Sequence, residues 1–259
     1  MKAMLSSLSI TGIRAHRLDG IGVTVIEVHT GAGLVGWGDG PWGGEVLRRH
    51  PGLVLGRSPF EAESIFDELS PEPRGGLDMA LWDLMGKALG KPVCELFGKP
   101  YRRRVLAGEP EDYAALRGSL RVAESVPAAW DLVDLLRPDV GAVGLTGARR
   151  ISYACWLNDV RLAPHCAGTP IRLAATLHWL ASVPPLTNAL NPPPVFFEYT
   201  LGEQSPAGRL TKEPFQADHS DGCVAVPEGA GLGVEVDRQV LASLRTGQIT
   251  LGVVREARA

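Results

Sequence analysis

The sequence predicts an α/β protein with an N-terminal α+β region followed by a region of alternating strands and helices. Three patterns predict this class: period-two alternation of apolar residues near the N-terminus, one strongly amphipathic helix over residues 77–89, and a repeated order of short apolar strand and helix after Arg104. The chain has 259 residues, which is enough for one large domain or two smaller ones.

The N-terminal region begins with a predicted antiparallel hairpin. Apolar residues alternate with polar ones in residues 23–28, and residues 34–38 form a second short strand beyond a Gly-rich turn at residues 31–33.

Two helices are expected next. Ser58 is a favourable N-cap and Pro59 suits the first helical position, which predicts a helix over residues 58–69. From Leu77 to Leu89 apolar residues recur every three and four positions, which is one face of a helix.

After Arg104 the pattern predicts a parallel sheet with helices packed on it. Strands are expected at residues 105–107, 120–123, 135–136, 160–163 and 195–197. Helices are expected near residues 111–116, from Pro127 onward, at residues 146–157 with Thr146 as the cap, and at residues 171–182. Residues 222–236 are rich in turn formers and are expected to return to the N-terminal region.

Composition excludes several classes of function. Hydrophobic residues make up 45% and charged residues 21%, and the net charge is -3, so no basic field is present to attract nucleic acid. No apolar run is long enough to predict a membrane span. The N-terminal residues lack a signal-peptide pattern, and the four cysteines are widely spaced, so we expect free thiols in the cytoplasm.

Ionisable residues follow four of the predicted strands. Glu124, Asp139, His165 and Glu198 each stand where a strand ends. Chemistry in parallel β/α architectures gathers at that edge, because the loops converge there. A single polar residue at a strand end is expected on any surface, whereas four in series favour a shared site.

His165 and Asp139 form the pair of greatest interest. Adjacent parallel strands lie about 4.8 Å apart, so a carboxylate on a neighbouring strand end can hydrogen-bond one imidazole nitrogen. That contact would orient the ring and leave the other nitrogen to move a proton. His178, by contrast, lies on an apolar helix and is expected to be a packed core residue.

Five stretches, in order along the chain, carry a family resemblance. They are a Gly-rich hairpin in which Asp39 stands where a glutamate is usual, an ALWDLxGK-like helix, a PDVxxxGGxT-like segment, a segment ending near His165, and a DGxVxVP-like run. Their positions are residues 31–39, 77–87, 138–147, 163–168 and 221–234. Together they resemble the enolase superfamily, on its mandelate racemase and muconate lactonizing enzyme branch.

The resemblance implies a capping domain on a modified (β/α)8 barrel. Residues 1–99, with a return at 215–259, would form the capping domain, and residues 100–214 the barrel. Members of this family abstract a proton alpha to a carboxylate, and a Mg²⁺ ion held by three carboxylates stabilises the product of that step. By this resemblance His165 and Asp139 are the catalytic dyad, Glu198 is the eighth-strand acid, and Glu124 is the third metal ligand.

The chain also departs from the family pattern. The fourth strand normally ends in E-x-P; here Gly108 takes the position of the ligand, and Glu109, at the variable position beside it, is the candidate substitute ligand. No lysine occurs between Lys99 and Lys212, so the second-strand K-x-K base is missing, and the third-strand aspartate has no counterpart. We therefore expect a shortened, incomplete barrel lacking about three strands, with Mg²⁺ weakly bound or absent.

Two functions stay open at this stage. The first is an enzyme that epimerises or dehydrates a small hydroxy acid or acid sugar, with Arg121 or Arg161 as a source of positive charge. The second is a pseudoenzyme that binds carboxylates or acts as an oligomeric scaffold. A homo-oligomer is expected in either case, because missing strands would expose sheet edges that need to be covered.

Overall fold

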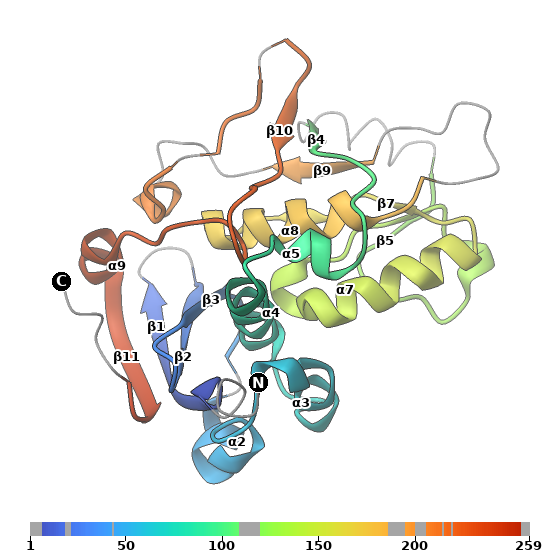
Figure 1. The fold of residues 1–259 in the computed structure, drawn as a ribbon. Coiled ribbons are helices and arrows are strands. Elements are labelled where there is room, and N and C mark those ends of the chain that lie inside the picture. The colour runs from blue at the N-terminus through green and yellow to red at the C-terminus, as the bar shows by residue number, and fades with distance from the viewer. Residues whose placement is uncertain are drawn as a thin grey trace.

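The structure combines an antiparallel sheet, two groups of parallel strands and the helices between them (Figure 1). This computed structural model describes residues 7–18, 22–42, 44–108, 120–185, 195–199, 206–213, 215–218 and 220–254. The helices are α2 (Gly44–Arg49), α3 (Ala62–Glu68), α4 (Gly75–Leu89), α5 (Val93–Leu96), α7 (Val140–Leu157), α8 (Pro170–Ser182) and α9 (Arg238–Leu244). Single 3-10 turns are η1 (Pro51–Leu53), η2 (Pro59–Glu61), η3 (Trp130–Leu132) and η4 (Pro206–Arg209). The predicted mixed α/β class is confirmed.

The antiparallel sheet joins both ends of the chain. Its strand order is β11-β1-β2-β3, formed by β1 (Ile10–Leu18), β2 (Thr24–Thr30), β3 (Val35–Asp39) and β11 (Arg245–Gly252). The predicted hairpin is confirmed as β2 and β3, closed by a turn in which Gly33 has a φ of 81°. Strand β11, red in Figure 1, runs along β1 and so returns the C-terminal part to the N-terminal sheet.

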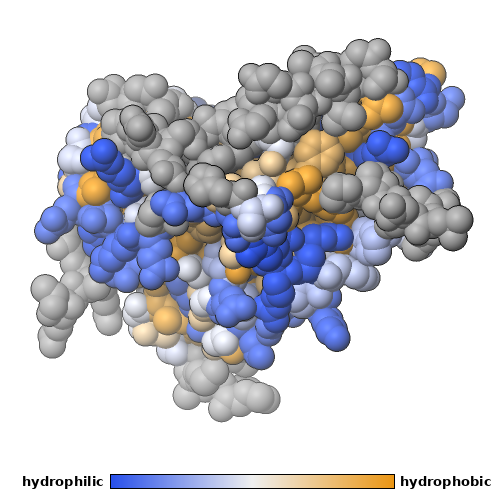
Figure 2. Space-filling view, turned by 90° about the horizontal axis from the view of Figure 1, so that it is seen from above, coloured by the Kyte–Doolittle hydropathy of each residue, from blue (hydrophilic) through white to orange (hydrophobic). Residues whose placement is uncertain are grey.

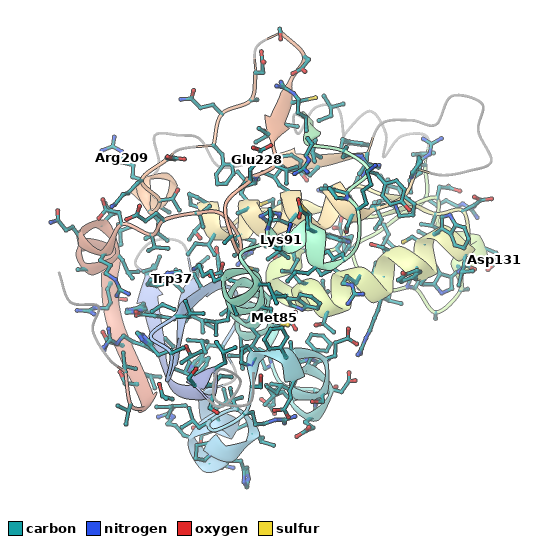
Figure 3. All side chains as sticks on the ribbon, in the orientation of Figure 1. Trp37, Met85, Lys91, Asp131, Arg209 and Glu228 are labelled. Atoms are coloured by element: carbon teal, nitrogen blue, oxygen red, sulfur yellow. The ribbon has the colours of Figure 1, made fainter. Side chains whose placement is uncertain are left out.

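Helix α4 lies at the centre of the molecule and is buried on every side from Gly75 to Gly86. It packs directly on β3: a Cβ added at Gly38 would lie 1.8 Å from the carbonyl oxygen of Gly76, so only glycine allows this approach. The predicted helix is confirmed, and it ends at Gly90, whose φ is 64°. Side chains fill the space on both sides of the sheet, with Met85 on α4 and Trp37 toward α9 (Figure 3).

The segment at residues 58–69 starts as predicted but is less regular. Ser58 caps η2 through a capping box with Glu61, and Pro59 follows it. The chain then continues as the separate helix α3.

The parallel strands form a continuous arc. They are β4 (Arg104–Gly108), β5 (Val122–Ala123), β6 (Leu135–Leu136), β7 (Arg161–Leu162), β8 (His165–Cys166) and β9 (Phe196–Tyr199). Pairing gives the orders β5-β6-β7 and β8-β9-β4. Strand β7 continues into β8 through Ala163, whose N–H donates to Leu136 of β6, and Pro164, whose carbonyl accepts from Glu198 of β9. Strand β10 (Cys223–Ala225) covers the other side of β4 in antiparallel pairing.

Three expectations in this region need comment. The helix expected from Pro127 is wrong, because that segment forms only the turn η3, and its Leu132 is exposed and so adds no burial to hold a helix. Helix α7 starts at Val140 rather than Thr146, bends at Gly144, and has Asp139 as its N-cap. The helix expected near residues 111–116 lies outside the described residues.

Within the ranges given above, no helix combines the length and apolar character needed to cross a membrane.

Candidate functional site

The structure places the four predicted strand-end residues around one edge of the parallel arc. Glu124 follows β5, Asp139 follows β6, His165 begins β8, and Glu198 lies on β9 directly beside His165 in the register. A hollow of about 490 Å³ opens there, lined by Glu124, Asp139 and His165 together with apolar side chains of α7. The strand ends therefore meet at one place, as their spacing along the sequence indicated.

His165 is oriented by Glu198. Its Nδ1 lies 3.1 Å from Oε2 of Glu198, and since a carboxylate can only accept, Nδ1 carries the proton. The Nε2 atom then keeps its lone pair. Burial, and next the positive charge of Arg137, lower the pKa of His165, which favours the neutral ring at pH 7. A neutral imidazole with one nitrogen fixed is suited to accept a proton at the other.

Arg137 joins two carboxylates of the site. Its Nη1 donates to Oε1 of Glu124 at 2.8 Å, and its Nη2 donates to Oε2 of Glu198. The guanidinium is nearly buried, at 9% exposed, and Pro138 follows it at the end of β6. The backbone N–H of Arg137 donates to the carbonyl of Ala123, which fixes β6 beside β5 at this edge.

Asp139 does not take the partner that the sequence suggested. One oxygen accepts from the N–H of Gly141 at 2.8 Å as the N-cap of α7, and the other accepts from Nη1 of Arg172 at 2.8 Å. The expected hydrogen bond from His165 to Asp139 is not formed, because the helix terminus and Arg172 occupy both oxygens. Glu198 is the partner of His165 instead.

Arg172 links the strand-end site to the antiparallel sheet. Its Nη2 donates to Oδ1 of Asp39 at 2.8 Å, while the N–H of Thr169 donates to Oδ2 of Asp39 at 2.6 Å. Burial disfavours the charge of Arg172, but Asp39 and Asp139 outweigh it and raise the pKa of the guanidinium. A Cβ at Gly141 would lie 2.4 Å from Cζ of Arg172, so this glycine makes room for the side chain.

The described carboxylates do not fit the three-ligand metal site that the family resemblance implies. No group of three or more His, Cys, Asp or Glu side chains in the described segments is arranged to hold a metal ion. Glu124 accepts from Arg137, and both oxygens of Asp139 are engaged. Glu109, the other residue predicted as a ligand, lies outside the described residues.

Sequence reasoning missed the two arginines that organise this site. It considered Arg121 and Arg161, but Arg121 pairs with Asp134 at 2.7 Å on an exposed face, and Arg161 is exposed. The signal for Arg137 was its place directly after β6, which is the same kind of strand-end position as that of Glu124. Arg172 lies on α8 and gave no signal of this kind.

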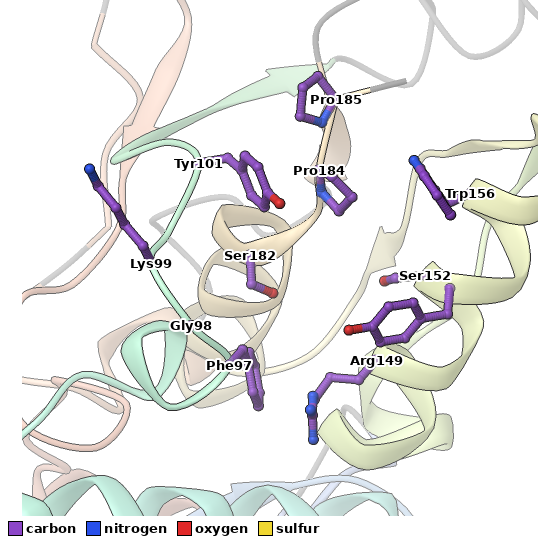
Figure 4. Close-up of a pocket in the computed structure, with 11 residues that line it drawn as sticks. Phe97, Gly98, Lys99, Tyr101, Arg149, Ser152, Trp156, Ser182, Pro184 and Pro185 are labelled. Carbon is purple, nitrogen blue, oxygen red and sulfur yellow. The ribbon is translucent and has the colours of Figure 1, made fainter. Parts of the chain in front are cut away.

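A second hollow, of about 480 Å³, lies between the connection from α5 to β4 and the C-terminal ends of α7 and α8 (Figure 4). Phe97, Tyr101 and Trp156 give it an aromatic lining. Its Arg149 donates to Glu63 at 2.9 Å and lies over the ring of Phe97. None of the four strand-end residues lines this hollow, so the candidate site is the one at the strand ends.

Two family models match the chain. The model described as "Enolase C-terminal domain-like" matches residues 126–240. The model of the "Mandelate racemase / muconate lactonizing enzyme, N-terminal domain" matches residues 60–98. The chain belongs to the enolase superfamily, on the mandelate racemase and muconate lactonizing enzyme branch.

Among curated proteins, similar relatives are named as a cycloisomerase and as a dehydratase family member. D-galactarolactone cycloisomerase of Agrobacterium fabrum (strain C58) is 22% identical over 376 residues, which covers 92% of this chain and 99% of that protein. A D-galactonate dehydratase family member of Streptomyces bingchenggensis is 35% identical over 99 residues, which covers 31% of this chain and 24% of that protein. The match to this dehydratase thus spans only about a quarter of its length.

Solved structures of the superfamily share the fold. An enolase protein from the environmental genome sequencing of the Sargasso Sea has a TM-score of 0.73 at 18% identity, over 95% of this chain and 100% of that one. An enolase of the mandelate racemase subgroup from Agrobacterium tumefaciens has a TM-score of 0.71 at 17% identity, over 94% of this chain and 99% of that one.

Proposed function

We propose that this superfamily member acts on a small hydroxy acid or acid sugar in the strand-end hollow, with His165 moving the proton on the carbon next to the carboxylate. The contact between His165 and Glu198 carries the proposal, since it fixes the ring and leaves Nε2 as a proton acceptor. The relatives named above, a cycloisomerase and a dehydratase of acid sugars, support the same substrate class.

The roles of the other residues follow from their contacts. Glu198 orients the imidazole of His165 and stabilises it when it becomes charged. Asp139, held by α7 and Arg172, lines the hollow and adds negative charge beside the ring. If water supplies a proton to the opposite face of the carbon the reaction is an epimerisation. If the hydroxyl on the next carbon leaves as water with the proton that His165 accepted, the reaction is a dehydration.

Hydrogen exchange tests this proposal. A panel of acid sugars is incubated with the protein in D₂O, and deuterium at the alpha carbon is followed by proton NMR. The wild type should exchange one sugar acid above background, and His165→Asn should lose that rate by about 10²-fold or more. His50→Asn, an exposed histidine outside the site, is the matched control and should keep the wild-type rate. Equal rates for the wild type and His165→Asn would contradict the proposal.

The second candidate is a carboxylate-binding protein that has lost the chemistry. The absence of a three-ligand metal cluster among the described side chains favours it, because the family's proton abstraction depends on charge stabilisation. Under this alternative, isothermal titration detects binding of a sugar acid while the exchange experiment shows only the background rate.

We further propose that the parallel arc is a family barrel shortened by about three strands. The order β5-β6-β7, continued by β8-β9-β4, follows the order of a closed barrel with a stretch left out. The alignment with the cycloisomerase extends over 376 residues, more than the 259 of this chain, so it opens gaps in this chain. On this proposal residues 100–214 are the barrel, and residues 1–99 with 215–259 are the capping domain.

A homo-oligomer is proposed as the cover for the shortened barrel. Strand β5 pairs only with β6 within the described residues, so its other edge is open there. Tyr153, Trp156 and Leu157 at the end of α7 are exposed apolar residues. Apolar side chains also gather in a band on the face seen from above (Figure 2). A monomer by light scattering at micromolar concentration would contradict this proposal.

All four cysteines lie in described segments and none forms a disulfide, which supports the proposal that the protein works in the reducing cytoplasm.

A further inference from the structure

The guanidinium of Arg137 lies between two carboxylates, and one of them, Glu124, is the residue that the family resemblance implies as a metal ligand. It donates to Glu124 at 2.8 Å and to Glu198, and these two residues come from β5 and β9, on either side of the strands that carry Arg137 and His165. Arg137 and Glu198 are buried, at 9% and 8% exposed. Salt and water therefore weaken the attraction between them far less than in a surface ion pair. One cation therefore already joins the carboxylates of this edge.

A divalent cation would compete for the same oxygen atoms. Mg²⁺ binds carboxylate oxygens at about 2.0–2.1 Å in octahedral geometry and gives up its waters reluctantly. Oxygen Oε2 of Glu198 already accepts from both Arg137 and Nδ1 of His165. For Mg²⁺ to enter between Glu124 and Glu198, the guanidinium would have to leave, and its buried charge would then lack both partners.

We infer that Arg137 is a built-in counter-ion that occupies the carboxylate of Glu124 in place of a divalent cation and ties it to Glu198. It holds the two strand ends together and neutralises part of their charge, so the site is assembled without metal. The inference rests on the proposed function only in taking the same hollow as the site.

Removal of the guanidinium is the direct test. Arg137→Met keeps a long side chain but removes the cation that joins Glu124 to Glu198. Arg161→Met is the matched control, because Arg161 lies on the neighbouring strand β7 and is exposed. Each protein is melted in EDTA and in saturating MgCl₂ or MnCl₂, and Mn²⁺ binding is titrated by electron paramagnetic resonance.

The wild type and Arg161→Met should have the same Tm in EDTA and in metal, with no stoichiometric Mn²⁺ site. Arg137→Met should melt lower in EDTA and gain about 5 °C or more with metal, since a ligand that binds only the folded state stabilises it by mass action. Adding Glu124→Gln to Arg137→Met should remove that gain.

Two results would overturn the inference. The first is a Mn²⁺ site in the wild type that Glu124→Gln abolishes, which would mean that metal and Arg137 do not exclude each other. The second is an Arg137→Met protein that folds and gains nothing from metal, which would mean that no metal position has been replaced. If Arg137→Met does not fold in EDTA, the test is whether Mn²⁺ restores its folding. Restored folding supports the inference, and failure to fold with Mn²⁺, or a Mn²⁺ site in the wild type that Glu124→Gln abolishes, overturns it.

These outcomes are independent of catalysis. If the protein fails the deuterium-exchange test but shows the expected metal responses, Arg137 is still the counter-ion and the proposed enzyme function is wrong. A wild type that exchanges deuterium only with Mg²⁺ present would keep the enzyme function and overturn the counter-ion.

Discussion

Asp83 on α4 and Glu198 at the edge of the parallel arc are both buried carboxylates, but they have different partners. Asp83 on α4 is 1% exposed and accepts from the backbone N–H groups of Trp37 and Leu232, each at 2.8 Å, as well as from Lys87. At the arc, Glu198 instead meets the side chains of Arg137 and His165.

The strands that lead to Glu124 and Asp139 are shorter than the longest strands of the antiparallel sheet. Strands β1 and β2 have nine and seven residues, whereas β5 and β6 have two each. Long paired strands and backbone partners give a charge one permanent position. Short strands that end in ionisable side chains bring those side chains to the hollow, where a ligand can reach them. The antiparallel sheet with α4 is therefore the fixed region, and the edge of the arc is the region open to a ligand.

The largest effect is expected at the contact between β3 and α4. Gly38→Ala places a methyl group 1.8 Å from the carbonyl oxygen of Gly76, and because that atom is backbone, the sheet and helix must separate. We expect a loss of about 3 kcal/mol or more in the free energy of unfolding, measured by urea titration. Gly52→Ala is the control, since a Cβ there meets nothing within 4 Å. Equal stability of the two variants would show that the contact between β3 and α4 tolerates a methyl group at Gly38.

The next effect contrasts one carboxylate from each region. Asp83→Asn removes the charge that Lys87 and two backbone N–H groups share in a buried place, and we expect a loss of about 2–4 kcal/mol. Asp134 accepts from the exposed guanidinium and from the backbone N–H of Arg121 near β6, so for Asp134→Asn we expect a smaller loss than for Asp83→Asn. Urea titrations of both variants check this, and a larger loss for Asp134→Asn would reverse the comparison.

The buried His178 of α8 makes the free energy of unfolding depend on pH. Burial lowers the pKa of His178 from 6.5 to about 4. The folded state then binds fewer protons than the unfolded state, so His178 makes stability fall as pH drops from about 6.5 to about 4, by at most about 1.4 kcal/mol per pH unit. His178→Gln should flatten this slope while it can still bond the backbone groups of Cys94 and Leu232.

Asp78 changes stability with pH in the opposite direction, so it is left intact in both the wild type and His178→Gln. Burial raises its pKa to about 7, so its contribution is present at low pH and is lost as pH rises from about 4 to about 7. The measured quantity is therefore the difference between the wild-type and His178→Gln slopes in urea titrations at several pH values. Identical slopes would show that His178 does not remain neutral in the folded state.

The smallest effect is expected at the edge of the fixed region. Ser58→Ala removes the side-chain cap of η2, in which the hydroxyl accepts from Phe60 and the Glu61 carboxylate accepts from the Ser58 N–H. We expect a loss of about 1 kcal/mol in urea titration. No loss would mean that packing of α3 alone holds this turn.

Local sequence patterns were enough to predict several of the helices and strands. The hairpin of β2 and β3 and helix α4 follow from periodicity and from turn and stop residues, because these signals act within a few residues of each other. The family also followed from short ordered motifs that include α4 and the segment around Asp139. The positions of Glu124, His165 and Glu198 at strand ends were readable for the same reason.

Tertiary structure alone decided which of these residues touch. That His165 pairs with Glu198 and not Asp139 depends on β8 lying against β9, and on α7 and Arg172 taking both oxygens of Asp139. That Arg137 bridges Glu124 and Glu198 depends on partners 13 and 61 residues away in the chain. Sequence pattern gives each residue its element and its side of that element, but the partner is set by strand order and packing, which bring distant segments together.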